Sequence, residues 1–216
     1  MLLLALACRP EHVDATPRPD DGWQDLTEDF PDPPEGGLAI RSPVMEIPPY
    51  SEVLLCYFGT YEGPTVGVDF MQPLQSDYSH HNQLKAVQDQ VYADGELIDC
   101  AINDSMAEYA PIFEAVGLEA SHETAEGNWL NLPDGIAMKL EGGQRWTLDM
   151  HYINPTGDWL LVNNGVNLGV VDVDEVDAWA GAMQFDAGPI EIEAGAEHQE
   201  QFDCSFEADA HILSLM

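Results

Sequence analysis

Two histidines, His80 and His81, stand side by side in the stretch YSHHNQL, although the chain of 216 residues has only seven histidines. A third, His151, lies in the stretch RWTLDMHYIN. Three neutral imidazoles suit copper or zinc, whereas calcium and magnesium prefer oxygen ligands. The alternative is that the pair consists of ordinary polar residues at a strand edge and that His151 is a half-buried structural histidine. Spacing alone favours neither interpretation.

The stretch around His151 predicts a β-strand, in which residues two apart share a face. One face then carries Trp146, Leu148, Met150 and Tyr152, and the other carries Arg145, Thr147, Asp149 and His151. His151 is therefore expected on the polar face. Adjacent strand residues point to opposite faces, so His80 and His81 can reach one ion only at a β-bulge, at a strand end, or through different directions and ring nitrogens. A junction between loop and strand after PLQSDYS would give that freedom.

The body of the chain predicts an all-β fold, an antiparallel jelly roll or β-sandwich. Short apolar or alternating segments are separated by Gly, Pro, Asn and Asp, as in SEVLLCYFGTY, TVGVDFMQ and WLLVNNGVNLGVV. The length and the hydrophobic content of 45% allow one sizeable core. Only DSMAEYAPIFEAVG offers a plausible helix, and Pro111 interrupts it.

The charge of the chain excludes some partners. Forty acidic residues against six basic ones give a formal net charge of -34, which repels phosphate backbones and anionic lipid headgroups. We therefore expect no binding to nucleic acid. The acidic residues are spread along the whole chain, which is typical of a solvated, self-repelling surface.

The N-terminal residues MLLLALACRPEH resemble the end of a bacterial lipoprotein signal peptide, in which the cysteine becomes lipidated. Residues 1–8 would then be the signal-like segment and Cys8 the anchor; the alternative is an apolar N-terminus with an idle cysteine. Residues 9–37, rich in Pro, Asp and Gly, predict a disordered tether. We expect an exported protein of the cell envelope, in the periplasm or at the outer surface, that contacts the membrane only through its lipid anchor.

The order of several motifs resembles a known family. MEIPPYSEVLLCYFGTY, SDYSHHNQL, GELIDC and LPDGIAMKLEGGQRWTLDMHYIN follow one another as in the N-terminal domain of the copper type II, ascorbate-dependent monooxygenases, which include peptidylglycine alpha-hydroxylating and dopamine beta-monooxygenase. The resemblance covers roughly residues 43 to 216. It implies that His80, His81 and His151 hold the copper that passes electrons. It also implies a disulfide between Cys56 and Cys100, for which two free buried thiols are the alternative.

The C-terminal residues, GPIEIEAGAEHQEQFDCSFEADAHILSLM, resemble the family's passage into its second domain. The resemblance implies that 38–192 form the copper-binding sandwich and 193–216 the truncated start of a second, similar one. It also implies that Cys204, the odd cysteine, pairs with a residue beyond residue 216. The missing C-terminal copper domain would hold the second copper, through an H-x-H motif that this sequence lacks.

Three functions follow as expectations. The first is the electron-transfer copper domain of a monooxygenase that hydroxylates C–H bonds of a small-molecule or peptide-like substrate with O2 and a reductant such as ascorbate. By itself this chain would then bind one copper ion without hydroxylating. The second is a non-catalytic lipoprotein that stores or transfers copper. The third is an acidic β-sandwich surface lipoprotein without a metal.

Overall fold

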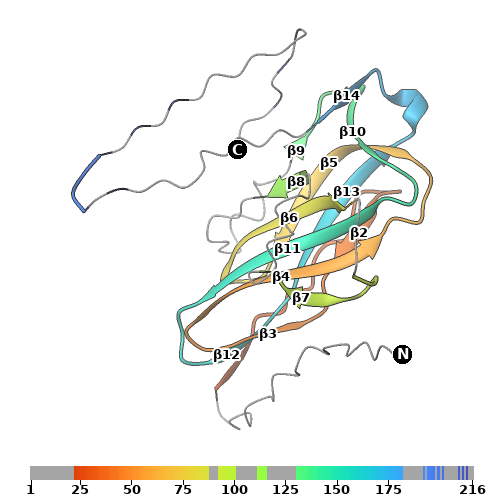
Figure 1. The fold of residues 1–216 in the computed structure, drawn as a ribbon. Coiled ribbons are helices and arrows are strands. Elements are labelled where there is room, and N and C mark those ends of the chain that lie inside the picture. Colours follow the sequence, from red (N-terminus) through yellow and green to blue (C-terminus); the bar gives the residue numbers. More distant parts are fainter. Residues whose placement is uncertain are drawn as a thin grey trace, which may run out of the picture.

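The computed structural model describes residues 22–87, 92–100, 111–115 and 130–181, together with isolated positions after residue 191 (Figure 1). The described residues form strands, turns and one short 3-10 helix at Val173–Glu175. The strands are β1 (Trp23–Asp25), β2 (Leu38–Arg41), β3 (Met45–Ile47), β4 (Ser51–Thr60), β5 (Val66–Gln75), β6 (Ser79–Val87), β7 (Leu97–Asp99), β8 (Pro111–Ala115), β9 (Leu130–Asn131), β10 (Ile136–Leu140), β11 (Arg145–Asn154), β12 (Trp159–Val162), β13 (Asn164–Val171) and β14 (Ala178–Ala180).

Two main sheets face each other. One is antiparallel, in the order β7-β4-β11-β6-β8, and the long strands β4, β11 and β6 lie side by side in it (Figure 1). The other runs β14-β10-β5-β13-β2, with the short β9 paired to β5. A small third sheet has the order β1-β12-β3. The predicted all-β sandwich is confirmed.

The core lies between the two main sheets. Leu148, Met150 and Tyr152 of β11 are fully buried there, on the face that the alternation predicts. They belong to one apolar cluster with residues of the opposite sheet, such as Met71 and Val166. Removing these side chains from water supplies the main driving force for folding.

The opposite face of β11 is less exposed than the sequence suggests. Thr147 and Asp149 are buried. A second, smaller apolar cluster of Cys56, Phe58 and Cys100 lies on the same sheet. The outer face of this sheet is therefore covered at its centre, and its polar groups have to find partners within the protein.

The tether predicted for residues 9–37 is wrong over its described part, residues 22–37. Strand β1 pairs in parallel with β12, and the Trp23 ring stacks on Trp159 with 5.5 Å between centroids. The Asn167 side-chain amide donates hydrogen bonds to the carbonyls of Pro31 and Asp32. A few aromatic and amide contacts thus fix a segment that has few aliphatic residues, which composition alone does not reveal.

The structure describes one further segment with a sequence-based expectation, residues 111–115, and leaves other predicted features outside the described residues. Residues 111–115, in the stretch with helical character, form the edge strand β8 against β6. Its first residue is Pro111, a position that a strand tolerates because no ladder hydrogen bond is lost there. Cys8 and Cys204 lie outside the described residues, and so does most of the predicted second domain at 193–216.

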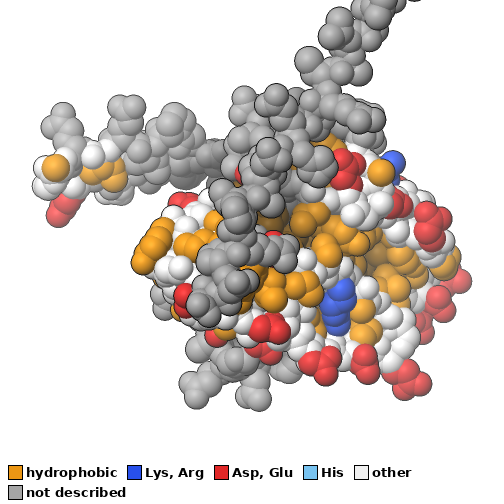
Figure 2. Space-filling model, turned by 90° about the horizontal axis from the view of Figure 1, so that it is seen from below, with side chains coloured by type: hydrophobic (Ala, Val, Ile, Leu, Met, Phe, Trp, Pro, Cys, Tyr) orange, Lys and Arg blue, Asp and Glu red, His pale blue; other side chains and the backbone are white. Residues whose placement is uncertain are grey.

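The surface carries many acidic groups. Figure 2 shows acidic side chains scattered over the face seen from below, with hydrophobic side chains gathered between them. None of the described residues form a helix with the length and hydrophobicity that a membrane crossing requires.

Candidate metal centre

A β-bulge brings the two adjacent histidines to the third. His81 pairs with His151 across β6 and β11, and the next paired residues are Ser79 and Tyr152, which leaves His80 as an extra residue in β6. A bulge inserts one residue and re-aims side chains that would otherwise point to opposite faces. The three rings contact one another, with 5.0 to 5.2 Å between centroids. Of the ways in which two adjacent histidines can reach one ion, the structure shows the β-bulge.

The turn before β6 prepares this bulge. Tyr78 has a φ of 64°, in the left-handed region that few non-glycine residues adopt. Its carbonyl accepts a hydrogen bond from the Ile153 N–H at 3.1 Å, and the Ser79 N–H donates to the Ser76 carbonyl at 3.3 Å. These bonds fix the backbone before His80, and the pairing of His81 with His151 fixes it after.

A buried polar network lies on the core side of the bulge. The Ser79 hydroxyl accepts a hydrogen bond from the Asn164 side-chain amide at 3.2 Å, and the Tyr152 hydroxyl donates to the side-chain oxygen Oδ1 of Asn164. The Ser76 hydroxyl lies 3.2 Å from the Tyr152 hydroxyl. Burial raises the pKa of the Tyr152 hydroxyl, which stays protonated and can donate. Because Asn164 belongs to β13, the network ties the bulge to the opposite sheet.

Sequence reasoning missed this network. Its members are separated by up to 88 positions, so no local motif joins them. A signal was available in the asparagines of the apolar stretch LLVNNGVNL, because a buried amide needs polar partners. Asn164 and Asn167 are both fully buried, and both make hydrogen bonds through their side chains.

The spacing of the imidazole nitrogens fits a metal ion. Nδ1 of His80 lies 3.0 Å from Nδ1 of His81, and one ring nitrogen from each of the three histidines lies within 4.8 Å of the others. Nitrogens bound to one ion at about 2.0–2.1 Å lie roughly 3 to 4 Å apart. The cluster therefore needs only a small closure to hold an ion such as copper or zinc.

The protonation of His81 suits metal binding. Burial, followed by the neighbouring His151 and His80 and by Lys85, lowers the pKa of His81 to about 4. At neutral pH the ring is therefore an uncharged imidazole, which is the form that binds metals. His80 is exposed and His81 and His151 are half-buried, so the cluster opens to solvent on the outer face of the sheet.

One carboxylate contacts the cluster. Glu52 Oε1 lies 2.8 Å from His151 Nε2. Glu52 stands opposite Ile153 across β4 and β11, two positions further along β11 than His151 and therefore on the same face of the strand. Of the two side chains, that of Glu52 is 69% exposed and that of His151 is 16% exposed. With Nε2 occupied by this contact, Nδ1 is the nitrogen of His151 that remains for a ligand.

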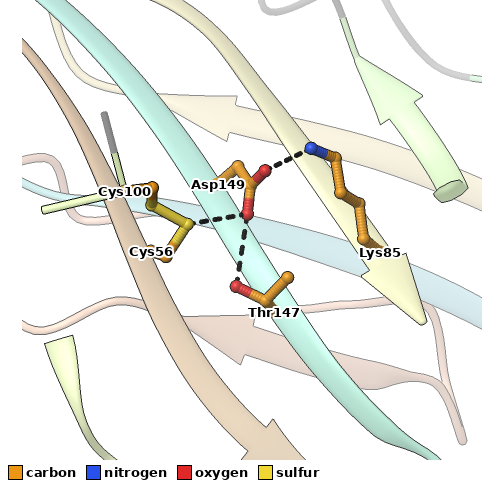
Figure 3. Close-up of a disulfide and its surroundings, with 5 residues drawn as sticks. All are labelled: Cys56, Lys85, Cys100, Thr147 and Asp149. Carbon is orange, nitrogen blue, oxygen red and sulfur yellow. Dashed lines mark hydrogen bonds and ion pairs between the residues drawn. A yellow bond between two sulfur atoms is a disulfide. The ribbon is translucent and has the colours of Figure 1, made fainter. Parts of the chain in front are cut away.

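The disulfide between Cys56 and Cys100 is formed, with 5.8 Å between the Cα atoms (Figure 3). It closes a chain segment of 44 positions that includes His80 and His81. Cys56 stands opposite Asp149 across β4 and β11, so the disulfide lies on the same sheet face as His151. The alternative of two free thiols is excluded in the structure.

Asp149 occupies the space between the disulfide and Lys85 (Figure 3). Its carboxylate forms an ion pair with Lys85, accepts a hydrogen bond from Thr147 at 3.2 Å, and lies 3.1 Å from the Cys56 sulfur. Burial raises the pKa of Asp149, and Lys85 opposes that shift. Asp149, Cys56 and Cys100 also lie close enough to hold an ion, but the disulfide bond uses both sulfurs.

Comparison with known proteins adds no assignment. No protein-family model matches the chain, and no curated protein matches it significantly. The structure thus brings His80, His81 and His151 together, and their role as metal ligands stays a prediction that the geometry supports.

Proposed function

We propose that the chain binds one copper ion through His80, His81 and His151 and passes electrons through it. The observation that carries this proposal is the convergence of the three imidazoles at the bulge of β6. Imidazole suits copper, zinc, iron and nickel, and copper(II) is bound most tightly of the common divalent ions. Copper also alternates between Cu(I) and Cu(II), which gives a site held only by nitrogen ligands a redox function.

In its full form the proposal is the electron-transfer domain of a copper-dependent monooxygenase. Such an enzyme hydroxylates a C–H bond with O2 and two electrons from a donor such as ascorbate. The order of the sequence motifs supports this form, and so does the open position of the cluster, which a reductant can reach. Within the part of the chain that the structure describes, no second group with free ligand atoms meets the spacing of a metal site. In this form of the proposal, O2 would be activated at a second copper site in another domain.

The second candidate function is storage or transfer of copper without catalysis. The exposure of His80 favours it, because a partner protein could take the ion by exchanging one imidazole at a time. For either function we further propose export and attachment to the cell envelope through Cys8. The disulfide supports export, since disulfides persist in oxidising compartments.

Copper stoichiometry and electron paramagnetic resonance (EPR) of the full chain test the proposal. The wild type should bind one Cu(II) per chain with nitrogen hyperfine structure, and ascorbate should bleach the signal without releasing the ion. His151→Ala should lose or change the signal. His211→Ala, which removes an exposed histidine outside the cluster, should not. Copper binding that is indifferent to His151 would overturn the site.

The same samples separate the two candidates. Reduced copper that stays on the chain in the presence of a Cu(I) chelator favours electron transfer. Rapid loss of the reduced ion to that chelator favours a carrier.

A further inference from the structure

Glu52 is a charged residue in direct contact with the histidine cluster, through His151. It lies 99 positions from His151 in sequence, and the pairing of β4 with β11 brings the two together. The contact joins one carboxylate oxygen to one ring nitrogen, Nε2, at 2.8 Å, which is the length of a charge-assisted hydrogen bond. An exposed pair of this kind contributes little to stability. An effect of Glu52 on the His151 ring therefore explains this contact better than a contribution to folding does.

The two nitrogens of an imidazole cannot serve the same purpose. A carboxylate is an acceptor, so it selects the tautomer with the proton on Nε2 and leaves a lone pair on Nδ1. At His80 and His81 the Nδ1 atoms are the ones that approach each other, at 3.0 Å. A metal ion held through Nδ1 of His151 would thus complete a set of three equivalent nitrogens.

We propose that Glu52 is a positioning residue for this centre: it holds the proton of His151 on Nε2, turns Nδ1 toward the ion, and biases the ion toward Cu(II) by its negative charge. This inference rests on the proposed function. A carboxylate that accepts from the outer nitrogen fixes the ring and increases its basicity, and loss of such a partner weakens metal binding by about 10- to 100-fold. Since Cu(II) carries one more positive charge than Cu(I), the nearby carboxylate stabilises the oxidised form more.

Two variants at Glu52 separate orientation from charge. Glu52→Gln keeps an acceptor oxygen and removes the charge, and Glu52→Ala removes both. For Glu52→Gln we expect the affinity for Cu(II) to fall about tenfold relative to Cu(I), which is a rise of about 59 mV in reduction potential. For Glu52→Ala we expect a further loss, with affinity for both oxidation states reduced by about 10- to 100-fold and a broadened EPR spectrum.

Glu62→Gln is the matched control. Glu62 is exposed and lies two positions after Thr60. Thr60 pairs with Arg145, which is at the other end of β11 from His151. This variant also removes one exposed negative charge, but away from the histidine cluster, and it should change neither the reduction potential nor the copper affinity. An equal shift in this control would attribute the effect to the overall charge and would overturn the role of Glu52.

The outcomes distinguish this inference from the proposed function. If the wild type binds no copper, or if His151→Ala binds it unchanged, the proposed function fails. If copper depends on His151 but Glu52→Ala keeps wild-type affinities, potential and EPR spectrum, only the role of Glu52 fails. A fall in coordination number on Glu52→Ala, measured by X-ray absorption, would also overturn it, because Glu52 would then be a direct ligand.

Discussion

Two clusters on the same face of the five-stranded sheet meet the spacing of a metal site, and they differ in what their atoms are free to do. His80, His81 and His151 lie at one end, half-buried or exposed, and Cys56, Cys100 and Asp149 lie beside them in a buried position. In the second cluster the sulfurs are joined in a disulfide and the carboxylate is engaged by Lys85. Closeness of ligand atoms is thus insufficient, and availability decides which cluster can bind.

The difference also separates a stabilising region from a chemical one. A disulfide closing a 44-residue segment removes conformational freedom from the unfolded chain, and the pairing of Asp149 with Lys85 satisfies a buried charge. The histidine cluster holds three imidazoles close together at the surface, and the exposed contact of His151 with Glu52 contributes little to the stability of the apo protein. Variants in the cluster of Cys56, Cys100 and Asp149 should therefore change stability, and variants in the histidine cluster should change copper binding.

The largest expected effect follows removal of the disulfide. The double variant Cys56→Ala and Cys100→Ala should lower the free energy of unfolding by about 4 kcal/mol, from the loop-closure entropy of a segment of this length. Urea denaturation measures it. At temperatures where the variant is folded it should still bind one copper ion, and loss of copper from the folded variant would show that the two clusters act as one.

Lys85→Met should destabilise the fold by about 3 kcal/mol, because it leaves the Asp149 carboxylate buried without its partner. The estimate is near the lower end for buried pairs since the Lys85 side chain keeps 16% exposure. Lys139→Met is the control: Lys139 pairs with Glu141 on the surface, and its loss should change the urea midpoint little. Equal effects of the two variants would contradict the distinction between buried and exposed pairs.

His81→Ala should weaken Cu(II) binding by at least about 100-fold, which is about 2.7 kcal/mol of binding free energy, without lowering the free energy of unfolding of the apo protein. The reason is that burial of His81 beside two other imidazoles makes its charged form unfavourable, so the ring is a ready ligand that contributes little to the fold. Isothermal titration with Cu(II) measures the first quantity and urea denaturation the second. A stable variant with unchanged affinity would remove His81 from the site.

The sequence predicts the three histidines of this site, but it does not predict the contact that holds His151 in place. The alternation in RWTLDMHYIN correctly places the side chains of His151 and Tyr152 on opposite faces of the sheet. The adjacency of His80 and His81 indicates a bulge as one way for both side chains to reach the same ion. The residues alone leave the role of the three histidines open, and only the resemblance to a family implies the electron-passing copper site and the disulfide. The contact of Glu52 with His151 could not be predicted, since it depends on the register of two strands far apart in sequence.

The same limit applies to two other segments of the chain. Residues 22–37 have the composition of a tether, but Trp23 finds Trp159 through a parallel pairing that composition does not encode. Residues 111–115 lie in a stretch with helical character and become an edge strand because β6 offers an open ladder. In both cases a partner distant in sequence overrides the local preference.

The smallest effect concerns the network behind the bulge. Tyr152→Phe removes the hydroxyl that bonds Asn164 and should cost about 1 to 2 kcal/mol of stability, because the Asn164 oxygen loses its partner inside the core. Since Asn164 also holds the Ser79 hydroxyl, the bulge should loosen. We therefore expect a several-fold loss of copper affinity and a broadened EPR spectrum, unlike the disulfide variant. A Tyr152→Phe protein that is destabilised but has an unchanged spectrum would show that the backbone turn at Tyr78 alone fixes the histidines.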